Sequence, residues 1–167
     1  ASTQSLGGFG ASGQFFGPVT LPAAGTYTLR IDPAGAATGG ATFNLYSGSD
    51  VVLPISIDGP TVSPSITTPG QKARLVFSAT ANQRISLRVT SSSLSSAYIT
   101  LRRPDGTTQN IGGFGSAGAY FDTVTLSQTG VYELVVDPSG TATGSATFAL
   151  YGVPADASGT ITPDGPA

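Results

Sequence analysis

The chain has 167 residues and a net charge of −2, with 39% apolar and only 10% charged residues. About a fifth of the residues are Gly or Pro, but disorder usually accompanies low hydrophobicity and high net charge, so the composition favours an ordered fold. Cys and His are absent, which excludes disulfides, thiolate sites and histidine-based catalysis or metal binding.

The main feature of the sequence is an internal repeat. Residues 7–46 return as residues 112–151 at a constant offset of 105, so that Phe9 matches Phe114 and Tyr27 matches Tyr132. Self-similarity at a fixed period indicates an array, and this period suits a whole β-sandwich of about 100 residues. The chain therefore holds about 1.6 repeats.

Short runs of alternating apolar and polar residues predict β-strands, while no stretch free of Gly and Pro has helical spacing. In residues 84–89 we expect Ile85, Leu87 and Val89 to face the core, and Arg84, Ser86 and Arg88 to face water. The runs, in chain order, are 27–31, 73–77, 84–89, 98–102, 124–126, 131–136 and 146–151. Such strands, separated by Gly and Pro turns, predict an all-β, antiparallel sandwich.

Turn residues set the expected domain boundaries. Asp58-Gly59-Pro60 recurs as Asp164-Gly165-Pro166 at the end of a Pro-rich stretch, which is typical of a connector between repeats. We expect residues 1–46 to be the C-terminal half of a repeat, and residues 47–60 to be a connector with an edge strand around residues 55–57. Residues 61–151 would then be a complete repeat, and residues 152–167 the connector to the next one.

The order of motifs in residues 61–151 resembles the bacterial pre-peptidase C-terminal (PPC-like) domains. The matching segments are Thr68-Pro69-Gly70-Gln71, residues 81–87 (ANQRISL), Ile99-Thr100-Leu101, Pro104-Asp105-Gly106-Thr107 and residues 129–136 (TGVYELVV). The resemblance implies jelly-roll-like β-sandwiches that serve as accessory, binding or spacer modules, and it extends to tandem repeats of large secreted bacterial proteins. Some members bind calcium, but this chain lacks a cluster of neighbouring acidic residues near the corresponding strand ends.

A glycine-rich G-x-G-x-x-G pattern occurs twice, at residues 8–13 and 113–118. Dinucleotide binding requires a helix after this pattern, whereas here an aromatic pair and a further strand follow. We interpret both segments as loops that each carry one aromatic anchor, Phe9 or Phe114. Each ring either tucks under its loop or lies exposed at a contact with a neighbour.

No catalytic, cofactor-binding or metal-binding residues are expected, and the chain is not predicted to be an enzyme. A serine nucleophile would lack a histidine base, and Lys72 is the only lysine. Asp32 and Asp137 open turn tetrapeptides, which explains them without a metal, although each could join backbone carbonyls in a calcium site.

Basic residues concentrate in one segment of the chain. The assembly candidates among them are Lys72, Arg74, Arg84, Arg88, Arg102 and Arg103, whereas residues 104–167 carry acids and no base. These charges either offset one another within one sandwich or face a neighbouring repeat or subunit in a head-to-tail arrangement. A pI near 4.7 argues against nucleic-acid binding, and no apolar run approaches the 18 or so residues of a membrane span.

The leading functional hypothesis is a structural repeat module of an extracellular bacterial fibre, surface protein or adhesin. Half a sandwich leaves an apolar face uncovered, so residues 1–46 are expected to contact a neighbouring repeat or to be completed by another molecule through β-strand addition. The alternative is an accessory module of a secreted enzyme that binds carbohydrate or another polymer. Low charge with abundant Ser, Thr and Gly favours a secreted or cell-surface location, with glycans as further partners.

Overall fold

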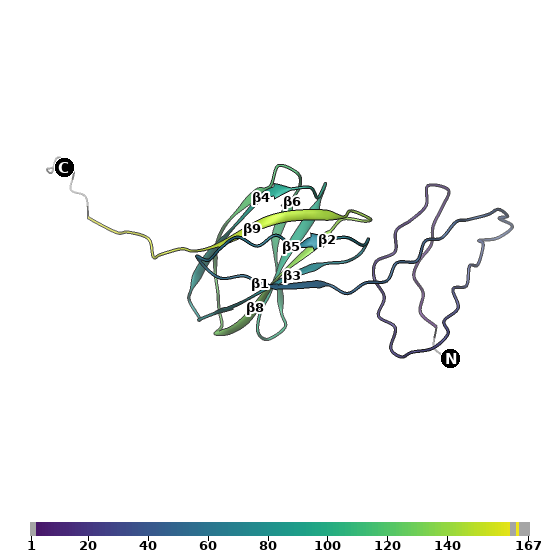
Figure 1. Ribbon diagram of the computed structural model, residues 1–167, viewed down its shortest axis with the longest axis horizontal. Helices are drawn as coiled ribbons and strands as arrows, with labels where there is room; N and C mark the ends of the chain where they lie inside the picture. Colours follow the sequence, from purple (N-terminus) through teal and green to yellow (C-terminus); the bar gives the residue numbers. More distant parts are fainter. Residues whose placement is uncertain (1–2, 161–162, 164–167) are drawn as a thin grey trace.

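The computed structural model describes residues 3–160 and 163, and no helix occurs among them. Nine strands form a β-sandwich, with the N-terminal segment beside it (Figure 1). Their bounds are β1 Val51–Pro54, β2 Ser65–Ile66, β3 Ala73–Ala79, β4 Arg84–Ser92, β5 Ala97–Arg102, β6 Thr108–Phe114, β7 Ala119–Thr125, β8 Gly130–Pro138 and β9 Gly144–Gly152.

Two sheets face each other. One has the strand order β1-β3-β8-β5-β6 and the other β2-β9-β4-β7. All ladders are antiparallel except the parallel pair β1–β3. Without β1, the two sheets of four have the strand order of a jelly roll, so the predicted all-β, jelly-roll-like sandwich is confirmed. The number of repeats remains a prediction.

The ladders join two halves of the chain. We call β2–β5 the first strand set and β6–β9 the second strand set. Apart from β1–β3, every ladder pairs a strand of the first set with a strand of the second. Neither set contains the hydrogen-bonding neighbours of its own strands, so neither can form this pair of sheets alone.

The core lies between the sheets and is built by strict alternation. In β8, Tyr132, Leu134 and Val136 are buried, whereas the residues between them are at least partly exposed. Ile85, Leu87 and Val89 are buried as predicted. Burial of this kind contributes about 1.5–3 kcal/mol for each large apolar side chain.

Ser86 departs from the predicted pattern, because it is buried rather than facing water. It lies on β4, between β7 and β9, at a register irregularity and opposite Tyr151 of β9. A short side chain on a central strand beside a large aromatic residue is screened from solvent without being part of the core. Alternation alone could not reveal this.

Residues 3–50 contain no strand in the structure. They run back and forth at one end of the sandwich (Figure 1), and the strand predicted at residues 27–31 has no ladder there. The physical reason lies in the topology. By the 105-residue offset, residues 3–46 correspond to the second strand set, and all the ladder partners of that set belong to the first.

The connector after residue 50 joins both sheets. β1 pairs with β3 from Val51 to Pro54, so the edge strand begins earlier than the predicted residues 55–57. The Ile55 N–H still donates to the Val76 carbonyl at 2.9 Å, and Ile57 then bridges Leu150 of the other sheet. Because Ile55 is buried, this Pro-rich segment is packed on the sandwich and does not swing freely.

Candidate assembly surface

Residues 3–46 reproduce the local geometry of the second strand set. The Tyr27 hydroxyl donates to the Ala23 carbonyl at 2.7 Å, and the equivalent Tyr132 hydroxyl donates to the Gln128 carbonyl at 2.8 Å. In both copies the tyrosine oxygen also accepts from the N–H of the same residue, Ala23 or Gln128. Such an i, i−4 contact resembles the tyrosine corner of other β-sandwiches.

The aromatic pairs match as well. Phe9 meets Phe43 edge to face at 5.5 Å between ring centroids, and Phe114 meets Phe148 in the same way at 5.8 Å. An edge-to-face arrangement is favoured by the quadrupoles of the two rings. The same side chains therefore come together whether or not the first strand set is present.

The two copies differ in what covers them. Tyr27 is 49% exposed and Leu45 is 99% exposed, whereas the equivalent Tyr132 and Leu150 are 0% and 1% exposed. We call this uncovered surface the open face. Its large apolar residues are Leu6, Phe9, Val19, Leu21, Tyr27, Leu29, Ile31, Phe43 and Leu45. Large exposed apolar patches are typical of interaction sites.

The two aromatic anchors predicted from the glycine-rich pattern therefore lie in different surroundings. Phe114 is buried, whereas Phe9 is 44% exposed on the open face. The pattern itself forms the tight turn between β6 and β7, where the Gly118 N–H donates to the Gly115 carbonyl at 2.9 Å. Gly13 and Gly10 form the same bond at 3.0 Å.

Three of the basic assembly candidates pair with acids of the same sandwich. Lys72 lies 2.6 Å from Asp137, and the Arg74 guanidinium donates to Glu133 through Nε at 3.1 Å and also through Nη2. Arg102 approaches the same Glu133 at 3.6 Å. Glu133, by hydrogen bonding and by its charge, raises the pKa of Arg74 further above its usual value. Charge offset within one sandwich thus accounts for these three residues.

The remaining basic candidates lie elsewhere. Arg84 holds the chain where it leaves β9, because its Nη1 donates to Asp156 at 3.0 Å and to the Pro154 carbonyl at 3.2 Å. Arg103 donates to Gln109 at 2.6 Å. Arg88 is exposed on β4. The structure does not bring the six basic residues together into one patch.

One carboxylate has a strongly shifted pKa. The Thr107 hydroxyl and backbone N–H, together with the Gln128 amide, donate to Asp105 and lower the pKa of its carboxyl to about 2. These donors favour the charged form. Asp105 is exposed in the turn between β5 and β6, and its bonds hold that turn together, as the Pro-Asp-Gly sequence predicts.

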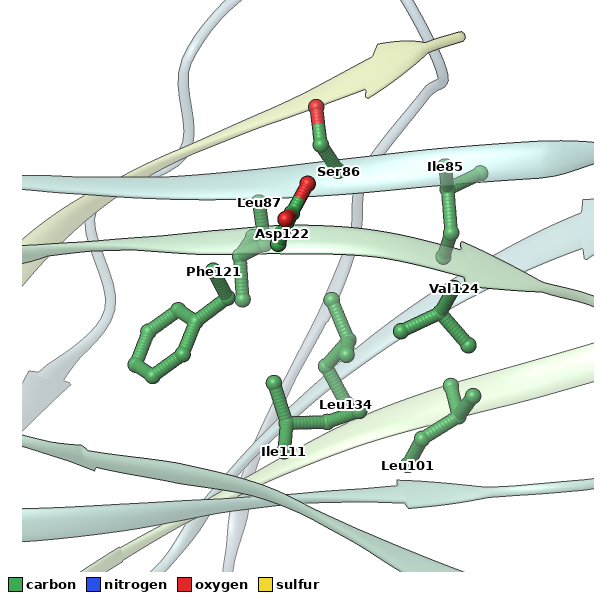
Figure 2. A pocket seen from close by; sticks show the side chains of 9 residues that line it. All are labelled: Ile85, Ser86, Leu87, Leu101, Ile111, Phe121, Asp122, Val124 and Leu134. Carbon is green, nitrogen blue, oxygen red and sulfur yellow. The ribbon is translucent and has the colours of Figure 1, made fainter.

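The cavity found in the sandwich interior is too small for a ligand. A cavity of about 10 Å³ lies between the sheets, lined by Leu101 of the first strand set and by Ile111, Val124 and Leu134 of the second. Figure 2 shows these side chains meeting, while Ser86 and Asp122 point away from them. This volume matches about one water molecule, whereas ligand sites occupy about 300–1,000 Å³. The cavity is a packing gap between the two sets.

A second depression is open to solvent and measures about 490 Å³. It lies where the connector leaves β3, and Ile55, Ile57, Val76 and Phe77 are among its lining residues. No charged residue lines it.

Among the described residues there is no group of three or more His, Cys, Asp or Glu side chains that could hold a metal ion. No helix in that part of the chain is long and apolar enough to cross a membrane.

Sequence reasoning missed two features of this surface. The tyrosine corner was signalled by the matching segments LPAAGTY and LSQTGVY, each of which ends on the tyrosine concerned. The interleaving of the two strand sets left no signal in the sequence, because it depends on strand order in space.

No known family profile matches the chain, and no curated protein does. Among solved structures, the chain is similar to the pre-peptidase C-terminal domain of a collagenase from Bacillus anthracis, with 13% identity and a TM-score of 0.48, over 60% of this chain and 95% of that one. It is also similar to PliG, a periplasmic inhibitor of g-type lysozyme, from Aeromonas hydrophila, with 16% identity and a TM-score of 0.44, over 62% of this chain and 99% of that one. The PliG of Salmonella Typhimurium has 15% identity and a TM-score of 0.42, over 60% of this chain and 98% of that one. The first of these structures is a domain of the kind that the motifs of residues 61–151 resemble.

Proposed function

We propose that this chain is a structural repeat module of an extracellular bacterial fibre, surface protein or adhesin, in which successive sandwiches contact one another in a line. One observation carries the proposal: the chain enters the sandwich through β1 at one end and leaves after β9 at the opposite end (Figure 1). With matching sequence 105 residues apart, units joined in this way extend linearly, as in other repeat proteins.

The packing of the connector supports the same role. The Asp58 N–H donates to the Leu150 carbonyl at 2.8 Å, and the Gly152 N–H donates to the Asp58 carboxylate at 2.9 Å. The segment that enters the sandwich is thereby fastened to the strand that leaves it. A force along the chain would then act on these hydrogen bonds and on the β-ladders.

Immunogold labelling tests this role on intact source cells, with antibodies raised against the chain. We expect gold particles in rows along filaments or surface layers. Label found only on dispersed particles in the culture medium would contradict the proposal and favour the accessory binding module. In that case, a pull-down on insoluble polysaccharides would retain the chain.

A further inference from the structure

The open face lacks a particular set of strands. Residues 3–9, 14–20, 25–33 and 39–47 correspond to β6, β7, β8 and β9 by the 105-residue offset. In the sandwich, β8 lies between β3 and β5, and β9 lies between β2 and β4. A single added strand could therefore not complete residues 3–46. The occupant must place one strand on each side of the segment equivalent to β8 and on each side of the segment equivalent to β9.

Two glycines of residues 3–46 point to the same occupant. A Cβ on Gly115 would lie 2.9 Å from the Ser95 carbonyl oxygen, and one on Gly113 would lie 3.3 Å from the Tyr98 ring. Their equivalents Gly10 and Gly8 have no atom within 4 Å and no left-handed backbone angle that would favour glycine. Both positions thus leave room for a strand like β5 and the loop before it.

The part of the chain that the structure describes does not supply the occupant. It contains two copies of the second strand set, residues 3–46 and β6–β9, but one first strand set, β2–β5. If one molecule donated its β2–β5 to the open face of an identical molecule, its own β6–β9 would lose their covering strands. A first strand set from a further repeat is needed for every set to be paired.

Charge indicates how that further repeat differs from β2–β5. In the sandwich, Arg74 lies opposite Val135 in the β3–β8 ladder, and Glu133 and Asp137 neutralise the surrounding cations. In the open copy, the position of Val135 is Arg30 and that of Glu133 is Thr28.

An unchanged copy of β2–β5 would set Arg74 directly against Arg30. Lys72, Arg74 and Arg102 would then join Arg30, which already lies 3.6 Å from Asp32, at a face where Glu133 has no acidic equivalent. Like charges directly opposite each other in a sheet are destabilising.

We propose that the open face takes up the first strand set of another, non-identical repeat, a four-strand segment patterned like residues 65–102 with an acidic residue at the position of Arg74, opposite Arg30. This inference rests on the proposed function and specifies the neighbour with which the module assembles. Arg30 would select the neighbour and so set the order of unlike repeats, as opposed charges do at other specific interfaces.

The test supplies the missing set in cis. A copy of residues 61–107 is joined in front of residue 3 of the full chain, once unchanged and once with Arg74→Glu in the added copy. Hydrogen exchange is followed by mass spectrometry in peptides that cover residues 27–31 and 41–45. Peptides from β3 and β8 report in the same sample whether the original sandwich is folded.

We expect both peptides to become protected in the two extended chains relative to residues 1–167. Exchange should be about two- to fivefold slower with Arg74→Glu than with the unchanged copy, which is the ratio expected for one cross-strand charge pair. Arg30→Val, which copies Val135, should reduce that difference, leaving only the part due to Lys72 and Arg102 of the added copy.

The proposed occupant is wrong if residues 27–31 exchange equally fast in all chains while β8 remains protected. If both peptides become protected but exchange no more slowly with Arg74→Glu than with the unchanged copy, the proposed acidic residue opposite Arg30 is wrong. Neither result bears on the immunogold labelling, since filaments could form through other contacts. Conversely, if no filaments are labelled, the hydrogen-exchange measurement still shows whether residues 27–31 and 41–45 are covered.

Discussion

At the scale of single residues, the two copies of the repeat allow one side chain to be compared with and without its surroundings. Tyr132 and Tyr27 make the same pair of hydrogen bonds, but only Tyr132 is buried. The local sequence thus suffices to form the corner. Burial decides what the corner contributes to stability, because a buried polar group without a partner costs far more than an exposed one.

Tyr132→Phe is expected to lower the free energy of unfolding by about 1–2 kcal/mol, because the Gln128 N–H and carbonyl lose their partner at a partly buried position. Tyr27→Phe is the matched control and should change it by less than about 0.5 kcal/mol. Urea denaturation of the full chain measures both. Equal effects of the two variants would contradict this interpretation.

Asp105 provides a pH dependence at the same scale. Its pKa falls from 3.8 to about 2 in the folded chain. A carboxyl with a lowered folded-state pKa stabilises the fold above its unfolded pKa, and this contribution is lost as pH falls through the folded value. We therefore expect the contribution of Asp105 to disappear between about pH 4 and pH 2. An NMR titration of its carboxyl carbon should have a midpoint near 2, whereas a midpoint near 4 would show that the Thr107 and Gln128 bonds do not form in solution.

At the scale of strands and turns, close approach of the two strand sets determines which glycines are required. A Cβ on Gly118, in the turn before β7, would lie 2.3 Å from the carbonyl oxygen of Val89 on β4. Gly140 has a similar left-handed backbone angle, but nothing lies within 4 Å of its Cβ position. Both glycines are favoured by their angle, and only Gly118 is also required by a neighbouring strand.

Gly118→Ala should therefore destabilise the chain by about 3 kcal/mol or more, because the β4–β7 ladder must shift in addition to the backbone strain. Gly140→Ala should cost only the strain, about 1–2 kcal/mol. Thermal unfolding monitored by circular dichroism separates the two variants. If Gly140→Ala proves at least as damaging as Gly118→Ala, the close approach of β4 is not the deciding factor.

At the scale of the whole molecule, the chain joins a complete sandwich to a copy of half of one. Both strand sets meet in residues 51–152, so we expect cooperative stability there. Residues 3–46 carry the same apolar residues without a covering set. Their hydrophobic residues gain little until a neighbour removes them from water.

Leu134→Asp should abolish cooperative unfolding, because an unpaired charge in the core costs several kcal/mol. Leu29→Asp, at the equivalent exposed position, should leave the free energy of unfolding of the full chain, measured in urea, within about 0.5 kcal/mol of the original. A loss of stability with Leu29→Asp comparable to that with Leu134→Asp would mean that residues 3–46 are already packed in solution.

The all-β class, the 105-residue period and the turns could be predicted from the sequence, since these depend on local chemistry. Alternation placed Ile85, Leu87 and Val89 inward, and Pro-Asp-Gly marked the turn between β5 and β6. Ser86 escaped prediction because its screening comes from an adjacent strand. The intramolecular pairing of Lys72, Arg74 and Arg102 was one of two open alternatives, because sequence does not say which strands are neighbours.

How the two halves of a repeat depend on each other became visible in the strand order of the two sheets. Strands paired through hydrogen bonds can be far apart in the chain, so the interleaving of β2–β5 with β6–β9 cannot be deduced from periodicity. That interleaving explains why residues 3–46, nearly a repeat of residues 108–151, form turns and aromatic contacts but no sheet. Local interactions shape the segment, whereas its ladders and its core require a second strand set from elsewhere.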